Sequence, residues 1–175
     1  PAGNPLPYAK PARAPAAFPD SGRRRSALIF RLPLTPDAPQ PTMPLPAPFS
    51  ALLAERFGKR FSTAEAVRTH HGHDESHFPD ALPDGVVWAH STAEVVEIVN
   101  LCREHRVPLI PYGAGSSLEG HILAVNGGLC LDLSEMNQIV AIHGEDMDAV
   151  VQPGVTRKTL NAALHGTGLF FPIDP

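Results

Sequence analysis

Residues 108–120 read Pro-Leu-Ile-Pro-Tyr-Gly-Ala-Gly-Ser-Ser-Leu-Glu-Gly, an apolar run followed by a glycine-rich segment. The first four residues, Pro108–Pro111, are an apolar run that predicts a short strand. The three glycines that follow let the backbone adopt positive φ angles and approach a ligand closely. Successive amides in such a turn suit an anion such as a pyrophosphate, and Ser116 and Ser117 add hydroxyl donors. The stretch therefore predicts a strand that leads into a phosphate-binding loop.

Two better-known phosphate loops do not fit this stretch. The Rossmann fingerprint G-x-G-x-x-G requires a glycine where this chain has Leu118. The spacing from Gly115 to Gly120 is that of a P-loop, but His121 and Ile122 stand where a P-loop needs Lys and then Ser or Thr. On the pattern alone, two interpretations stay open: a pyrophosphate cradle, and a glycine-rich turn that binds no ligand.

The residues before the loop predict a β-α-β unit. Val86–Ala89 is a β-rich apolar run, and Ser91–Glu94 is a capping box that opens a helix ending near His105. This helix and the strand at Pro108–Pro111 complete the unit, whose two strands should be parallel and joined by a right-handed crossover. The apolar face of the helix is expected to consist of Val95, Val96, Ile98, Val99 and Cys102.

The residues after the loop predict a third strand and a second small subdomain. Leu129–Leu133 reads as a strand, and the runs 139–142 and 149–152 read as an antiparallel pair. A helix capped by Thr156 should follow and run to about His165, where two glycines stop it.

Residues 49–80 are expected to form a helical lead-in to the domain. Ser50 can cap a helix that runs to Phe57, and Ser62–Glu65 has the pattern of a capping box for a second helix. Four histidines, at 70, 71, 73 and 77, suggest a metal site. Gly72 and Pro79 interrupt any rigid helical register, so a solvated or hydrogen-bonding histidine loop is the preferred interpretation and no metal is assigned.

Residues 1–48 hold 13 of the 20 prolines and are expected to be a disordered extension. Their Arg-rich, acid-poor composition leaves a mitochondrial presequence as the alternative, although the prolines oppose its amphipathic helix. A third interpretation is an upstream extension with Met43 as the natural start. Residues 43–175 carry eight Lys and Arg against sixteen Asp and Glu, which argues against a nucleic-acid partner.

The chain shows no sign of a disulfide framework or a membrane span. Cys102 and Cys130 are the only cysteines and form no C-x-x-C motif, so both are interpreted as small buried residues. No apolar stretch approaches the roughly 20 residues that a spanning helix needs. A cytoplasmic protein is the default expectation.

Four motifs together resemble a known family. They are the stretch from Pro111 to His121, residues 131–137 (Leu-Asp-Leu-Ser-Glu-Met-Asn), residues 151–155 (Val-Gln-Pro-Gly-Val) and residues 168–175 (Gly-Leu-Phe-Phe-Pro-Ile-Asp-Pro). In this order they resemble the FAD-linked oxidases with a p-cresol methylhydroxylase or vanillyl-alcohol oxidase type of FAD-binding domain. Within that family the resemblance is greatest to the cytochrome-linked D-lactate dehydrogenases, and it covers about residues 50 to 175.

The resemblance implies an α+β fold and a bound FAD. Residues 81–175 would be the N-terminal part of the FAD-binding domain, made of the β-α-β subdomain and the start of a second mixed subdomain. Relatives that bind flavin covalently often have a histidine where Gly115 stands, so the FAD is expected to be non-covalent. The residues implied to contact FAD are Tyr112, Gly113, Ala114, Gly115, Ser116, Ser117 and Gly120 at the pyrophosphate and Pro172, Ile173 and Asp174 along the flavin.

The implied activity is oxidation of a D-2-hydroxy acid, D-lactate to pyruvate, with electrons passing to cytochrome c or a quinone. This implies peripheral attachment to the inner membrane as a second possible location. A glycolate oxidase subunit and a non-catalytic fragment or nucleotide-binding module are the alternatives. The family's second glycine- and alanine-rich segment and substrate domain would follow Pro175, so the chain alone is expected to be inactive. His121 and His143 are interpreted as structural, and no catalytic residue is assigned.

Overall fold

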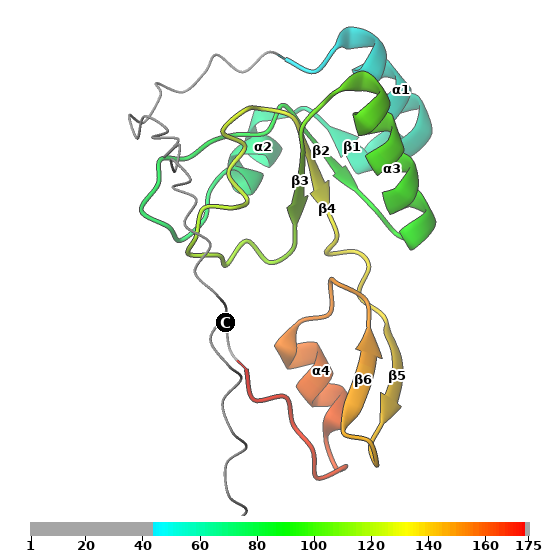
Figure 1. Cartoon of the computed structure of the whole chain (residues 1–175). Coiled ribbons are helices and arrows are strands. Elements are labelled where there is room, and N and C mark those ends of the chain that lie inside the picture. Colours follow the sequence, from blue (N-terminus) through cyan, green and yellow to red (C-terminus); the bar gives the residue numbers. More distant parts are fainter. Residues whose placement is uncertain (1–43, 174–175) are drawn as a thin grey trace, which may run out of the picture. The chain divides into compact units, whose positions relative to one another are not determined.

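The structure, a computed structural model, describes residues 44–173 (Figure 1). Expectations about residues 1–43 and about Asp174 lie outside the described residues. The elements in chain order are α1 (Ala47–Phe57), η1 (Gly58–Arg60), β1 (Phe61–Ser62), α2 (Glu65–His71), β2 (Gly85–Trp88), α3 (Thr92–His105), β3 (Leu109–Tyr112), β4 (Leu129–Asp132), β5 (Ile139–His143), β6 (Asp148–Val151) and α4 (Arg157–Leu164).

A four-stranded sheet with the order β1-β2-β4-β3 forms the centre of the first half of the fold. Strands β2 and β3 each pair in parallel with β4, so the predicted parallel relation of the β-α-β unit is confirmed. Strand β4 lies between them, which the sequence did not predict. Strand β1, which pairs antiparallel with β2 at the sheet edge, was also not predicted.

The sheet is buried on both faces. Because side chains alternate along a strand, Val87 and Leu131 face α1 and α3, whereas Val86 and Cys130 lie on the face that α2 covers. Figure 1 shows α1 and α3 together beside the sheet and α2 apart from them. The main core cluster consists of Leu45, Phe49, Leu53, Phe57, Val87, Ala89, Ile98, Cys102, Leu129, Leu131 and Met136.

Both cysteines are buried and free, as predicted. Burial raises the pKa of Cys102 to about 11, and burial together with the charge of Asp132 raises that of Cys130 to about 12. Both thiols therefore stay protonated near neutral pH and pack as small apolar groups.

The predicted helix starts were right in two places and wrong in two. The Ser91 side chain accepts from the Glu94 amide at the start of α3, and the Thr156 side chain caps α4. Ser50 is not a cap, because α1 already begins at Ala47 and the Ser50 amide donates to the Pro46 carbonyl. The disordered extension predicted for residues 1–48 therefore overlaps the first two residues of α1.

The capping box predicted at Ser62–Glu65 does not form. The Ser62 hydroxyl accepts from the Ala64 amide, while Ala64 itself precedes α2 without a side-chain cap. The reason is that α2 begins at Glu65, so Ala64 rather than Ser62 occupies the N-cap position.

The apolar face predicted for α3 is narrower than expected. Ile98 and Cys102 are buried and Val95 packs against the core, but Val96 and Val99 are exposed. A helix that lies on one face of a sheet buries only one stripe, and these two valines fall beside it.

The second half of the fold follows the prediction closely. Strands β5 and β6 pair antiparallel, and α4 follows them. Beyond α4, Gly166 and Gly168 have φ angles of 84° and 80°, which explains why the chain turns there.

Two of the four clustered histidines, His70 and His71, lie in the last turn of α2 rather than in a loop. Within residues 44–173 no three His, Cys, Asp or Glu side chains are grouped in a way that could hold a metal ion. None of the described helices is long and apolar enough to cross a membrane.

Candidate functional site

The glycine loop follows β3 directly and begins at the carboxyl end of the parallel strands, where open α/β sheets bind ligands. Gly115 and Gly120 have φ angles of 70° and 71°, as expected for a loop that needs glycine. Gly113 does not have a positive φ, so of its two expected roles only close approach of the backbone to a ligand remains a prediction. Nothing lies within 4 Å of the position that a Gly113 side chain would occupy, so the backbone is open on that side.

A cavity of about 640 Å³ opens beside this loop. One wall is the start of the loop, and the other is the turn into α4 together with Ser134, which follows β4. The lining residues are Gly113, Ala114, Ser116, Ser134, Pro153, Gly154, Val155, Thr156, Arg157 and Lys158. Its volume lies within the range of roughly 300–1,000 Å³ that is typical of small-molecule sites.

The α4 wall is favourable for an anion. The first turn of a helix presents unpaired amides and a partial positive charge, and the first turn of α4 contains no acidic residue. Arg157 and Lys158 add two cationic side chains to the lining. Gly154 fits tightly beside β4, because a side chain there would lie 2.5 Å from the carbonyl oxygens of Leu133 and Ser134.

The structure brings together only part of the predicted site. Gly113, Ala114 and Ser116 line the cavity, whereas Tyr112, Gly115, Ser117 and Gly120 do not. The Ser117 hydroxyl instead bonds to His121 Nδ1 at 3.1 Å and accepts from the Glu119 amide. Pro172 and Ile173 are exposed and line no described cavity.

The α4 wall of the cavity was not predicted from the sequence. Its signal was present, because Pro153-Gly154 breaks the chain just before a Thr-capped helix whose first residues are Arg157 and Lys158. Cationic side chains in the first turn of a helix are unfavourable because they repel the positive end of the helix dipole. A nearby anion offsets this cost, so such cations indicate an anion-binding site.

A buried ion pair lies beneath the loop and was also missed. His71 Nε2 is 2.8 Å from Asp132 Oδ2, and His71 Nδ1 is 2.8 Å from the Val67 carbonyl oxygen. The His71 ring also packs against the Tyr112 ring, with centroids 4.4 Å apart. Both His71 and Asp132 are buried. Sequence spacing gives no sign of this pair, since its members are 61 residues apart.

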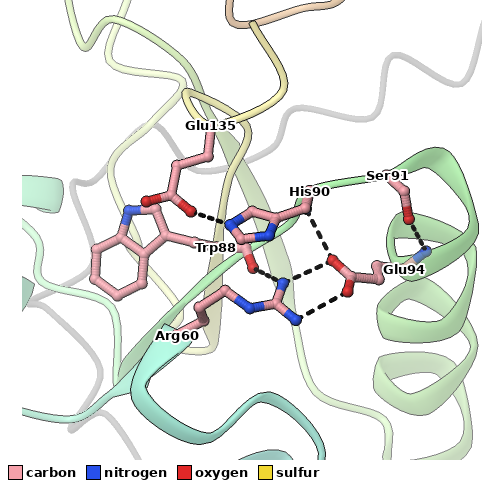
Figure 2. Close-up of polar contacts among 6 residues, drawn as sticks. All are labelled: Arg60, Trp88, His90, Ser91, Glu94 and Glu135. Carbon is pink, nitrogen blue, oxygen red and sulfur yellow. Dashed lines mark hydrogen bonds and ion pairs between the residues drawn. The ribbon is translucent and has the colours of Figure 1, made fainter.

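A second polar cluster connects the sheet edge with the start of α3 (Figure 2). Arg60 donates to both oxygens of Glu94 at 2.7 and 2.9 Å and to the Trp88 carbonyl. Glu94 also accepts from the His90 amide, and the His90 ring bonds to Glu135. Mainly through the Arg60 hydrogen bonds, the pKa of Glu94 falls to about 2. This cluster ties η1, α3 and the segment after β4 together.

A family model described as an FAD binding domain matches residues 83–175, more than half of the chain. The chain belongs to this FAD-binding family. Its fold is the mixed α/β fold of the p-cresol methylhydroxylase type, as predicted. It resembles a solved 4-ethylphenol oxidase from Gulosibacter chungangensis (TM-score 0.63, 26% identity) over 70% of this chain and 24% of that one. It also resembles p-cresol methylhydroxylase (TM-score 0.53, 25% identity) over 66% of this chain and 23% of that one.

Curated relatives align with a similar part of the FAD-binding chain. A probable mitochondrial D-lactate dehydrogenase of Danio rerio is 48% identical over 65% of this chain and 23% of its own length. A mitochondrial cytochrome-type D-lactate dehydrogenase of Arabidopsis thaliana is 46% identical over 62% of this chain and 19% of its own. A glycolate oxidase subunit of Bacillus subtilis is 38% identical over 67% of this chain and 25% of its own length. The FAD-binding chain thus spans about a quarter or less of these relatives.

The cavity of this FAD-binding chain fits the pyrophosphate of FAD. Its lining combines an open glycine backbone, the hydroxyls of Ser116, Ser134 and Thr156 and the two cations of α4, all of which suit phosphate oxygens. Val155, Ala114 and Pro153 add apolar surface to the lining.

Proposed function

We propose that this chain holds the pyrophosphate of FAD in a flavoprotein that oxidises a D-2-hydroxy acid, with D-lactate as the first candidate. The observation that carries the proposal is the cavity in which the glycine loop faces the start of α4. Two elements that each favour an anion converge there, and the family binds FAD.

The role of this chain's residues is to position the cofactor. The loop backbone and the hydroxyls of Ser116 and Ser134 would donate to the phosphate oxygens, and Arg157 and Lys158 would balance their charge. Bound FAD supplies the chemistry by accepting a hydride equivalent from the α-carbon of the substrate. Gly113 would leave room for close approach, because its open side faces no other atom within 4 Å.

The names of relatives support the choice of substrate and electron acceptor. Two relatives are named D-lactate dehydrogenases, and the Arabidopsis thaliana name includes cytochrome, which favours cytochrome c over a quinone as acceptor. A glycolate oxidase subunit is the alternative, supported by the Bacillus subtilis relative. The Danio rerio and Arabidopsis thaliana relatives are also named mitochondrial, which supports the mitochondrial alternative over the cytoplasmic expectation.

The FAD would be bound without a covalent bond. In this proposal the loop presents glycine rather than a histidine at position 115, and no nucleophilic side chain of the loop is needed to hold the cofactor. Denaturation in acid should therefore release all of the flavin into the supernatant. Flavin that stays with the precipitated protein would contradict this part of the proposal.

The chain by itself should bind FAD weakly and oxidise nothing. A ligand of this size is normally enclosed from several sides, and the cavity here supplies the contacts to one part of it. Each solvent-facing hydrogen bond contributes about 1 kcal/mol, whereas micromolar binding requires about 8 kcal/mol.

The test compares this chain with the full-length protein that contains it. Each is titrated with FAD by flavin fluorescence and assayed for dye reduction with D-lactate and with glycolate. We expect FAD binding and D-lactate oxidation only by the full-length protein. Preference for glycolate would establish the alternative substrate, and a full-length protein that binds no FAD would refute the proposal. A chain that alone binds FAD tightly and turns over would overturn the assignment of a partial site.

A non-catalytic nucleotide-binding module is the competing function. It predicts that the full-length protein binds FAD but does not reduce it with any 2-hydroxy acid under anaerobic conditions. Bleaching of the flavin absorbance on addition of D-lactate would exclude it.

A further inference from the structure

We propose that the buried pair of His71 and Asp132 is a positioning device that holds both walls of the cavity at the spacing FAD requires. This inference rests on the proposed function of the cavity. Neither His71 nor Asp132 lines the cavity, so the effect of the pair must pass through the residues that it contacts.

The hydrogen-bond geometry and the directions of the two pKa shifts favour an imidazolium paired with a carboxylate. The Val67 carbonyl can only accept, so His71 Nδ1 carries a proton. An ionised Asp132 can also only accept, so Nε2 carries the second proton. Burial alone would lower the pKa of His71, but its hydrogen bonds to Asp132 and Val67 and the charge of Asp132 raise it overall. Burial would likewise raise the pKa of Asp132, yet its hydrogen bonds from His71 and Ser134 lower it.

His71 acts on the glycine-loop wall of the cavity through Tyr112. The His71 ring packs on the Tyr112 ring, and the Tyr112 hydroxyl lies directly under Gly115, where it would overlap any side chain. Tyr112 is the last residue of β3, so the orientation of its ring is coupled to the path of the backbone that enters the loop. His71 thus supports the loop from below.

Asp132 acts on the opposite wall of the cavity through Ser134. Asp132 uses Oδ2 for His71 and Oδ1 for the Ser134 amide, which donates to it at 2.7 Å. Ser134 lines the cavity opposite the loop. The Asp132 carboxylate therefore connects His71, which supports the loop, with the backbone of Ser134 in the opposite wall. Between these two contacts, the Leu133 amide donates to the Tyr112 carbonyl.

Stability alone gives little reason for such a pair. Side-chain exposure is 4% for His71 and 5% for Asp132, and a buried ion pair often stabilises a fold no more than apolar residues of the same volume would. The pair instead fixes orientation, because each of its hydrogen bonds holds one neighbouring group in place. Fixed geometry is what a preorganised binding site needs.

The experiment measures FAD dissociation constants for the full-length protein after removal of the flavin. The variants are Asp132→Ala, His71→Ala and Asp132→Asn, and folding of each is checked by circular dichroism. In Asp132→Asn the new amide can donate to Nε2 of a neutral His71, while its oxygen still accepts from Ser134. The matched control is His73→Ala, which removes a 2.8 Å His–Asp pair that is exposed.

We expect Asp132→Ala to weaken FAD binding most, because it frees both walls, by more than about tenfold, or about 1.4 kcal/mol. His71→Ala should weaken FAD binding about tenfold. Asp132→Asn should keep the FAD affinity within about twofold of the wild-type value, and His73→Ala should leave it unchanged. Nitrogen-edited NMR should show two slowly exchanging ring N–H protons for His71 in the wild type and one in Asp132→Asn.

A merely structural role predicts a different pattern. Folded Asp132→Ala and His71→Ala proteins with wild-type FAD affinity would overturn the inference, as would an Asp132→Asn protein as weak as Asp132→Ala. If the alanine variants do not fold, Tyr112→Leu tests the same connection with an apolar side chain, and unchanged affinity there refutes it. Failure of the wild type to bind FAD would instead refute the proposed function, so the two failures are distinguishable.

Discussion

The sheet region, residues 44–137, and the hairpin region, residues 138–173, bury very different amounts of their apolar side chains. The sheet region holds all but two of the buried apolar residues, and several of its side chains are completely buried. The hairpin region buries only Leu160 and Leu164, while Val140, Met147, Val150 and Phe170 are exposed. The sheet region thus completes a core from its own residues, whereas the hairpin region relies on local hydrogen bonds and one small helix.

The largest expected effect comes from matched leucine-to-alanine substitutions in the two regions. Leu53→Ala in the sheet region should lower the free energy of unfolding by about 3 kcal/mol, because Leu53 is fully buried in the main core. Leu164→Ala in the hairpin region should cost about 1 kcal/mol, because this region has only one other buried apolar side chain and Leu164 already borders a cavity. Urea denaturation followed by far-UV circular dichroism measures both. Equal losses would mean that the two regions share one cooperative core.

A second comparison separates the conformational role of glycine from its role in binding. Gly115→Ala should destabilise the chain by about 1–3 kcal/mol, because φ is 70° and the new methyl group overlaps the Tyr112 hydroxyl. Gly113→Ala should change stability by less than about 0.5 kcal/mol, since its surroundings are open, but should weaken FAD binding. Thermal unfolding and FAD titration of the full-length protein distinguish the two. A Gly113→Ala protein with normal FAD affinity would place the cofactor elsewhere.

Changes of pH should affect the sheet region through His71 and Asp132. His71 has a raised pKa in the folded state, so its contribution is complete below its unfolded value and is lost as pH rises through the folded pKa. Asp132 has a lowered pKa, so its contribution is present above its unfolded value and is lost as pH falls through the folded pKa. Wild-type stability should decline on the alkaline side, and Asp132→Asn should remove that decline. Urea midpoints between pH 6 and 9 test this, and parallel curves for both proteins would contradict it.

The smallest expected effect compares the two helix caps. Ser91→Ala at α3 should cost about 1 kcal/mol of global stability, because α3 packs on the main core. Thr156→Ala removes the same kind of bond at α4, but we expect less than about 0.5 kcal/mol globally and faster local hydrogen exchange in 157–164. A global loss at Thr156 as large as that at Ser91 would show that α4 unfolds together with the sheet.

The residues of this chain determined most of the local structure. The apolar runs, the cap at Ser91 and the Pro-Gly break before Thr156 predicted five of the strands and the helices α3 and α4, because these signals act over a few neighbouring residues. The two-residue strand β1 was missed, since a segment that short has no periodicity to detect. Val96 and Val99 were misplaced because burial depends on what a helix packs against.

The candidate site was only half predictable for the same reason. Glycine spacing identified Gly113, Ala114 and Ser116, because the loop is continuous in sequence. Only the tertiary structure placed Ser134 and the first turn of α4 opposite that loop. It alone paired Asp132 with His71, since β4 enters the sheet between β2 and β3 and carries its last residue toward α2. Side-chain contacts over 61 residues arise from the order of strands in the sheet, which local sequence signals do not encode.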